Sequence, residues 1–240
     1  MIEVFISIES KLNIRRENSK MDLERLKNLF LSIVLSIIIT SIVQKVAKAF
    51  IGEENYTKIN IKKLKIFLII STFAYTISIF KIYPNNLDRF GYFIFFVLAI
   101  IISLIDYYTM YVYDILVFSG IIIQSVVKIV NGNVEILVDS VLAGLLCALV
   151  SYLIVKATNM MGTGDIGVYA LCAMTIGFES SLSLIPGSFL VSAIFLIIRF
   201  ICGNRDKKIA FAPYIIIAAI LNILGFDILR CYLDIIEKII

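Results

Sequence analysis

The sequence predicts an all-α, polytopic integral membrane protein with about eight transmembrane helices. Hydrophobic residues make up 60% of the 240 residues, and charged residues make up only 17%. A soluble surface carries roughly 25–35% charged residues, so this chain has too few to coat one. Its apolar residues also fall in long blocks separated by short polar stretches, which is the pattern of repeated bilayer crossings.

Eight apolar blocks are candidate transmembrane spans. They are residues 29–44, 66–83, 90–105, 112–130, 136–157, 166–178, 180–198 and 209–226. A span needs about 20 apolar residues, with a range of roughly 17–25, so the short block 166–178 is the weakest candidate. Glycine and serine recur inside the later blocks, where small side chains let helices approach closely.

Two flanking segments differ from the predicted spans. Residues 1–28 form a polar tail of mixed charge without the pattern of a cleavable signal peptide, and Met21 within it is a second candidate start. Residues 227–240 place their apolar side chains on one stripe of a helix, which predicts an amphipathic segment on the membrane surface. We therefore expect three parts: the polar tail, a transmembrane domain over 29–226, and the amphipathic C-terminal segment.

Lysine and arginine residues predict the orientation of the spans. If all eight blocks cross the bilayer, the loops 45–65 and 199–208 lie on one side together with Lys156, and this side holds eleven basic residues. The other side receives five, apart from six more in the tail 1–28, which weigh against the assignment. Because cytoplasmic loops are enriched in basic residues, we expect the side with eleven to face the cytoplasm.

The sequence contains no histidine. This absence excludes zinc proteases with imidazole ligands and serine or cysteine catalysis with a histidine base. An enzyme of this composition has to rely on carboxylates, lysines or tyrosines. The four cysteines lie 25 or more residues apart, which gives little support to a zinc site or a redox pair. We predict no cofactor and no metal, and no basic run with interleaved aromatic residues indicates nucleic acid.

Acidic residues at the ends of predicted spans are costly in a membrane and are therefore functional candidates. Asp106 ends the block 90–105, and Asp165 precedes the block 166–178. Two spans separate these residues, so the chain returns to its starting side between them. The crossing pattern therefore predicts that Asp106 and Asp165 share one face of the membrane, and that Asp139 lies on the other.

Two glycines precede Asp165, in the run Met161-Gly162-Thr163-Gly164-Asp165. Glycines permit unusual backbone angles in a tight turn and leave room for another part of the chain to approach. A carboxylate in the first turn of a helix is favoured by the helix dipole. An ordinary helix cap explains Asp165 equally well, so the run alone does not decide between a cap and a catalytic group.

Three motifs in order carry a resemblance to a known family. Met161–Asp165 resembles the Gly-x-Gly-Asp signature of type IV prepilin peptidases and the related preflagellin peptidases. Leu104-Ile105-Asp106-Tyr107 resembles the other aspartate site of these intramembrane aspartic proteases, and Ala210-Phe211-Ala212-Pro213-Tyr214 resembles a third motif that opens their last span. The resemblance extends from about residue 66 to residue 226.

The resemblance implies a function that composition alone does not. It implies an aspartic endopeptidase of the cell (inner) membrane that removes the short basic leader of type IV prepilin-like, pseudopilin or preflagellin substrates at the cytoplasmic face. The implied site consists of the catalytic pair Asp106 and Asp165, with motif support from Gly162, Gly164, Pro213 and Tyr214. The implied partners are the leader-bearing protein and the lipid bilayer.

The sequence departs from the family pattern at three places. Tyr113-Asp114 stands where the family usually has Pro-Asp or Pro-Asn, and Gly167 stands where it often has lysine. Many bacterial members also N-methylate the trimmed pilin and carry paired Cys-x-x-Cys motifs after their first span. The corresponding loop here, Lys45–Lys65, holds no cysteine, so we expect a peptidase without methyltransferase activity.

Other interpretations stay open at this point. Tyr113-Asp114 followed by Gly-x-Gly-Asp is also similar to signal peptide peptidases, which would make Asp114 and Asp165 the pair, although their Pro-Ala-Leu motif is missing. Otherwise Asp114 is a neighbour of the substrate site. Lys156 is either a second such neighbour or a membrane anchor. From another class, Asp106 and Asp165 could couple proton or cation transport in a membrane carrier.

Overall fold

The computed structural model describes residues 2–52, 56, 59–131, 134–158, 161–203 and 209–226, with side chains from residue 26 onward. Across these residues the chain forms helices joined by short turns, and no strand is present. The predicted all-α class is confirmed. The segment 227–240, where we predicted an amphipathic helix, lies outside the described residues.

A helix occupies most of each of the eight predicted blocks. The helices are α1 (Ile2–Ile51), α3 (Ile61–Ile82), α4 (Asn86–Thr109), α5 (Asp114–Val130), α6 (Val134–Thr158), α7 (Thr163–Ile176), α8 (Phe178–Ser181), α9 (Leu184–Ile201) and α10 (Ala212–Ile223). The single turn α8 is an element that the apolar pattern did not predict. It follows Gly177, whose φ of 85° ends α7 in a conformation that glycine adopts without strain.

Five of these helices are long and apolar enough to cross a bilayer: α3, α4, α6, α9 and residues Leu26–Ile51 of α1. The chain is therefore a polytopic membrane protein, as predicted. Helices α5, α7 and α10 have 17, 14 and 12 residues, and the count of eight spans stays a prediction. Most side chains of α7 from Val168 to Thr175 are buried, so this short helix is surrounded by protein rather than by lipid.

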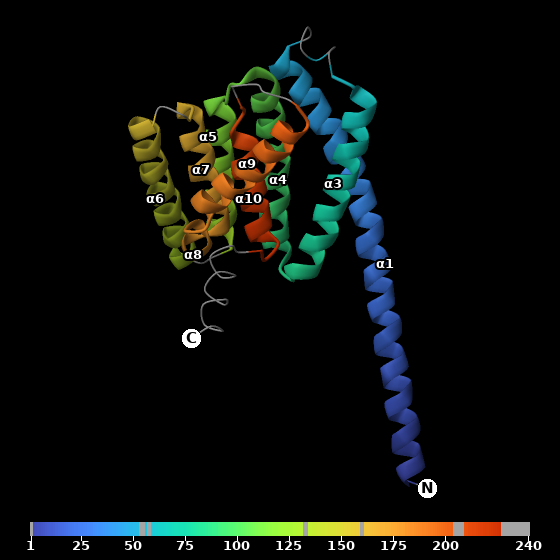
Figure 1. Cartoon of the computed structure of the whole chain (residues 1–240). Coiled ribbons are helices and arrows are strands. Elements are labelled where there is room, and N and C mark those ends of the chain that lie inside the picture. The colour runs from blue at the N-terminus through green and yellow to red at the C-terminus, as the bar shows by residue number, and fades with distance from the viewer. Residues whose placement is uncertain are drawn as a thin grey trace.

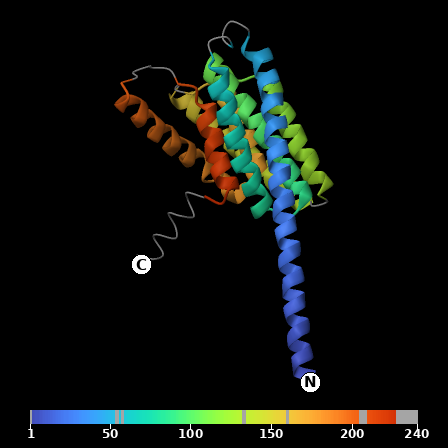
Figure 2. The same cartoon turned by 90° about the vertical axis from the view of Figure 1, so that its right-hand side faces the viewer.

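The helices run up and down in one bundle (Figure 1). Helix α1 is continuous from the predicted tail into the first span, and its N-terminal part extends beyond the lower end of the bundle in this view. The C-terminal ends of α4 and α6 and the N-terminal ends of α5, α7 and α10 all meet at the upper end. From the side, α9 leans away from the other helices (Figure 2).

Close helix contacts occur at glycines. A Cβ atom placed on Gly144 of α6 would lie 2.5 Å from the side chain of Met174 on α7, and one on Gly120 of α5 would lie 2.9 Å from Leu171. These distances are shorter than any normal contact, so a larger residue would require Met174 of α7 to move at Gly144, and the Leu171 side chain to move at Gly120. The small residues thus set the position of the helix that carries Asp165.

Candidate active site

A cavity of about 280 Å³ opens at the upper end of the bundle, where α4 ends and where α5, α7 and α10 begin. It is lined by Asp106, Asp114, Asp165, the glycine turn 162–164, the turn 110–112 and residues 209–211, which lead into α10. The crossing pattern predicted that Asp106 and Asp165 share one face. The structure places both in this single cavity.

Asp106 lies in the last turn of α4 and is only 5% exposed. Its Oδ2 atom accepts a hydrogen bond of 3.0 Å from the backbone N–H of Ala212, the first residue of α10. A carboxylate is favoured at this position because the N-terminal N–H groups of a helix have no partner within the helix and carry partial positive charge. The carboxyl group of Asp106 therefore ties the end of α4 to the start of α10.

Asp165 lies in the first turn of α7 and is 6% exposed. Its Oδ2 atom accepts a hydrogen bond of 3.1 Å from the backbone N–H of Gly162, the residue that precedes α7. This is the carboxylate half of a capping box. Asp165 therefore does cap its helix, as the structural alternative predicted, and it lines the cavity as well.

The two glycines before Asp165 act differently from our expectation. Gly162 has φ −72° and ψ 149°, angles that any residue adopts, and Gly164 lies within the helix without positive φ. The expectation of unusual backbone angles is therefore wrong. The expectation of close approach is confirmed for Gly164, since a Cβ atom there would lie 2.8 Å from the Cβ of Val112. The turn after α4 packs directly on the glycine turn.

The turn after α4 contains a residue that the sequence did not single out. Met110 adopts the left-handed conformation, with φ 54°, and its N–H bonds the carbonyl oxygen of Asp106 at 2.8 Å. Glycine or asparagine is usual at such a helix end, so no residue type marked this position in advance. The turn ends α4 at Thr109, three residues after Asp106, and directs the chain toward Val112 and Gly164.

Of the other predicted site residues, only some line the cavity. Asp114, the first residue of α5, is exposed and lines the cavity. Lys156 is exposed near the end of α6 and is not part of the lining. Pro213, in the first turn of α10, faces an apolar groove beside the cavity. Tyr214 is buried, and its ring centroid lies 5.6 Å from that of Phe195 on α9. It therefore packs α10 against α9.

Gly167 occupies the position where the family often has lysine. A Cβ atom there would lie 3.0 Å from the side chain of Val117 on α5, so a side chain at this position would require Val117 to move. This departure from the family pattern matches the close packing of α5 and α7 in this protein.

The charges in the cavity are of one sign. Three carboxylates line it, and among its described lining residues there is no lysine or arginine. Two buried carboxylates that share a small space disfavour simultaneous ionisation. In the described part of the chain, no group of three or more histidine, cysteine, aspartate or glutamate side chains is arranged to hold a metal ion.

Asp139 lies at the opposite end of the bundle, as the crossing pattern predicted. Its Oδ2 atom accepts a hydrogen bond of 2.9 Å from the N–H of Phe178, the first residue of α8. It lines a second polar cavity together with Lys128 and Asp88. This aspartate holds the turn after α7 and is far from the pair Asp106 and Asp165.

Fold and site together define a polytopic membrane protein in which two buried aspartates from separate helices share one cavity at the end of a helix bundle. Residues 93–203, a segment that contains both aspartates, match the model of the type IV leader peptidase family. The resemblance seen in the sequence is thereby confirmed. No curated protein and no solved structure matches the chain.

Proposed function

We propose that this leader peptidase is an aspartic endopeptidase that uses Asp106 and Asp165 to remove the short basic leader of prepilin-like, pseudopilin or preflagellin substrates. One observation carries the proposal: the two carboxyl groups, from α4 and α7, line a single cavity at one end of the bundle. Cleavage at the cytoplasmic face of the cell membrane follows from the basic loops predicted at this end.

The proposed mechanism uses the pair as a unit that holds one proton between its members. The ionised carboxylate accepts a proton from water as the water oxygen attacks the scissile carbonyl carbon. The protonated carboxyl donates to the carbonyl oxygen and, when the C–N bond breaks, a proton passes to the leaving amine. The N–H groups of Ala212 and Gly162 each bind one carboxylate oxygen, which orients the acids toward the cavity.

The charge of the cavity supports a basic leader. Asp106, Asp114 and Asp165 attract lysine and arginine side chains, and no positive side chain of the described lining opposes them. We also propose that the protein has no N-methyltransferase activity, because its Lys45–Lys65 loop contains no cysteine pairs. Transfer of a methyl group from S-adenosylmethionine by the purified protein would contradict this part alone.

The two alternatives differ in how they fit the geometry. A proton- or cation-coupled carrier requires acids near the bilayer midplane, commonly at broken helices, whereas Asp106 and Asp165 lie at helix ends. A pair of Asp114 and Asp165 is compatible with the cavity, but Asp114 is exposed while Asp106 is buried beside Asp165. Burial beside a second acid favours Asp106 as the partner.

The test is cleavage of a leader-bearing substrate by the purified protein in liposomes. Asp106→Asn and Asp165→Asn each remove one carboxylate without changing shape, so each is expected to lower the cleavage rate by at least about 10³-fold. Asp139→Asn is the matched control, because it makes the same change at the opposite end of the bundle and is expected to leave the rate unchanged. Full processing by either of the first two variants contradicts the assigned pair.

A further inference from the structure

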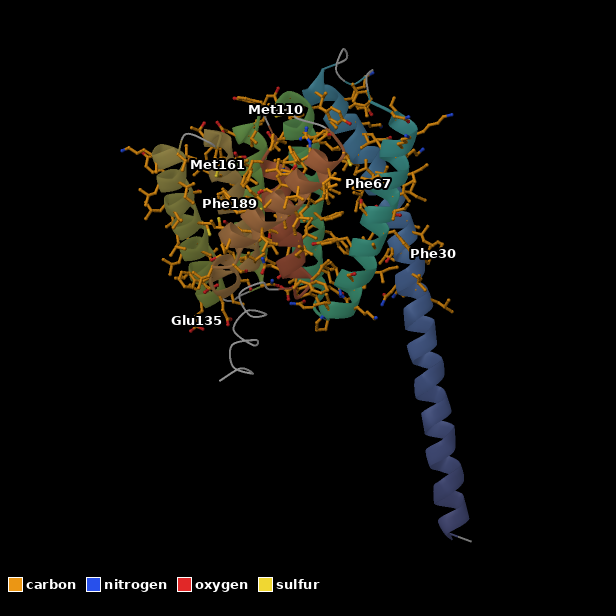
Figure 3. The ribbon with its side chains drawn as sticks, viewed as in Figure 1. Phe30, Phe67, Met110, Glu135, Met161 and Phe189 are labelled. Carbon is orange, nitrogen blue, oxygen red and sulfur yellow. The ribbon has the colours of Figure 1, made fainter. Side chains whose placement is uncertain are left out.

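A long apolar groove lies beside the candidate active site. It has a volume of about 590 Å³ and is bounded by α3, α4 and α10. Its floor is closed where the rings of Tyr75 and Phe96 stack, with centroids 3.9 Å apart and an interplanar angle of 7°. Phe67 forms part of the α3 wall in the upper half of the bundle (Figure 3). The groove is therefore a feature of the surface that would face lipid.

The groove is long enough to hold several turns of a helix. On α3 it extends from Leu64 to Ser78, which corresponds to about 21 Å at a rise of 1.5 Å per residue. Along this wall, Ser71, Ala74 and Ser78 recur at helical spacing and present small side chains to the groove. Small residues allow another helix to approach closely within a membrane, so the wall accepts a helix packed along α3.

The upper end of the groove lies next to the cavity that holds the two aspartates. Tyr107, which lines the groove, follows Asp106 in the chain, and Pro213, which lines it from α10, follows Ala212. Ala212 is the residue whose N–H binds the Asp106 carboxylate. A polypeptide that leaves the groove at this end is therefore next to the two acids.

The charges around the upper end of the groove favour a substrate that has both a basic segment and an apolar helix. The groove itself is apolar, and the adjoining cavity carries three carboxylates. Lys62, Lys63 and Lys65 are exposed at the start of α3, where they repel a basic segment. A chain with a basic segment followed by an apolar helix thus has its helix in the groove and its basic segment drawn toward the cavity.

We propose that the groove between α3, α4 and α10 binds the apolar helical stem of the substrate, directly C-terminal to the cleaved bond. The inference rests on the proposed function and adds where the substrate is held. Binding of the stem fixes the position of the scissile bond relative to Asp106 and Asp165. Packing of the stem helix in the groove therefore orients the bond for attack.

A bulky residue in the groove tests the proposal. Ala74 is exposed to the groove, so Ala74→Phe fills it without disturbing the core. Ala193→Phe is the matched control, since Ala193 is also exposed and lies on a spanning helix, α9, that does not line the groove. The probe is a protein with a lysine-rich leader, a glycine junction and an apolar stem of about 20 residues, together with a short peptide that ends after the junction.

The proposal predicts different effects on the two probes. Ala74→Phe raises KM for the stem-bearing protein at least tenfold with little change in kcat, while cleavage of the short peptide stays at the wild-type rate. Ala193→Phe behaves as wild type with both. Equal KM values for the stem-bearing protein in wild type and Ala74→Phe overturn the proposal, and so does a rise in KM confined to Ala193→Phe.

Disulfide cross-linking gives a second test that does not depend on cleavage. The exposed thiol of Cys202 and the thiol of Cys231 are replaced by serine, and Asp165→Asn retains the uncleaved substrate. Ser71→Cys is then expected to cross-link to single cysteines placed in the substrate stem, and Ala193→Cys is not. Cross-links of Ser71→Cys to a second copy of the enzyme only, or no cross-link in a membrane that contains the substrate, overturn the proposal.

The two tests separate this inference from the proposed function. Cross-linking of the stem to Ser71→Cys without cleavage by the wild-type enzyme leaves the groove assignment in place and contradicts the peptidase. Cleavage by the wild-type enzyme without cross-linking, and without an effect of Ala74→Phe, contradicts the groove and leaves the peptidase in place.

Discussion

The bundle has a polar cavity of about 280 Å³ at each end, and the two differ in charge balance. At the lower end, Asp88 and Asp139 lie within electrostatic range of Lys128, and each also accepts a hydrogen bond, from Asn131 and from the N–H of Phe178. At the upper end, the described hydrogen bonds of Asp106 and Asp165 come from backbone N–H groups alone, and the described lining of their cavity contains no lysine or arginine.

This difference indicates that the aspartates of the lower cavity have a structural role and that those of the upper cavity have a chemical one. A carboxylate that has a nearby cation and accepts a hydrogen bond at a helix junction stabilises the junction. Two carboxylates without a cation compete for one proton. The latter arrangement supplies both an acid and a base, which is why we assign the chemistry to the upper end although both ends contain paired acids.

After the loss of either catalytic aspartate, the largest effect is expected where the upper cavity depends on a close contact. Gly164→Ala places a Cβ atom 2.8 Å from the Cβ of Val112, so the turn after α4 has to shift away from Asp165. A displacement of about 1 Å at a catalytic pair costs roughly 100-fold in rate, measured as kcat/KM for leader removal. Gly162→Ala is the control, because its Cβ atom meets only Asp165 Oδ2 at an ordinary 3.5 Å.

A compensating change sharpens this prediction. Val112→Ala shortens the side chain that Gly164→Ala would contact, so the double variant is expected to recover most of the lost rate. If the double variant is as slow as Gly164→Ala alone, the contact with Val112 is not the reason for the glycine.

An intermediate effect is expected when the lower cavity loses its cation. Lys128→Met leaves Asp88 and Asp139 without their positive neighbour, which is expected to lower the free energy of unfolding by about 1–2 kcal/mol. The measurement is thermal unfolding in detergent, with leader removal assayed in parallel. Adding Asp139→Asn removes one of the two charges and is expected to restore part of the stability. If Lys128→Met folds but does not cleave, the assignment of a purely structural role to the lower cavity is contradicted.

The smallest effect is expected from the third carboxylate of the upper cavity. Asp114→Asn keeps the size of an exposed side chain and removes one negative charge. The attraction of a basic leader then weakens, and kcat/KM is expected to fall by no more than about tenfold, through KM. High salt should reduce the difference from wild type. Complete loss of cleavage would instead make Asp114 the partner of Asp165.

Much of the site could be predicted because it follows from linear patterns. The sequence has no histidine, and it places acidic residues at the ends of apolar blocks. Both features indicate carboxylates as the catalytic groups. The run Gly162–Asp165 and the segment Leu104–Tyr107 carried the family resemblance. The role of Gly164 was predicted only in part, because a close approach depends on which residue lies opposite, and Val112 gives no signal in the sequence.

Apolar block length and the parity of crossings determined by themselves which end of the bundle each acid occupies, since each crossing of a bilayer reverses the side of the chain. They placed Asp106 and Asp165 at one end and Asp139 at the other. Only the tertiary structure decided that α4, α7 and α10 are neighbours, so that Asp106 receives the N–H of Ala212 and shares a cavity with Asp165. The reason is physical: hydrophobicity specifies depth along the membrane normal, whereas lateral proximity depends on side-chain packing between helices, to which Gly120 and Gly144 contribute.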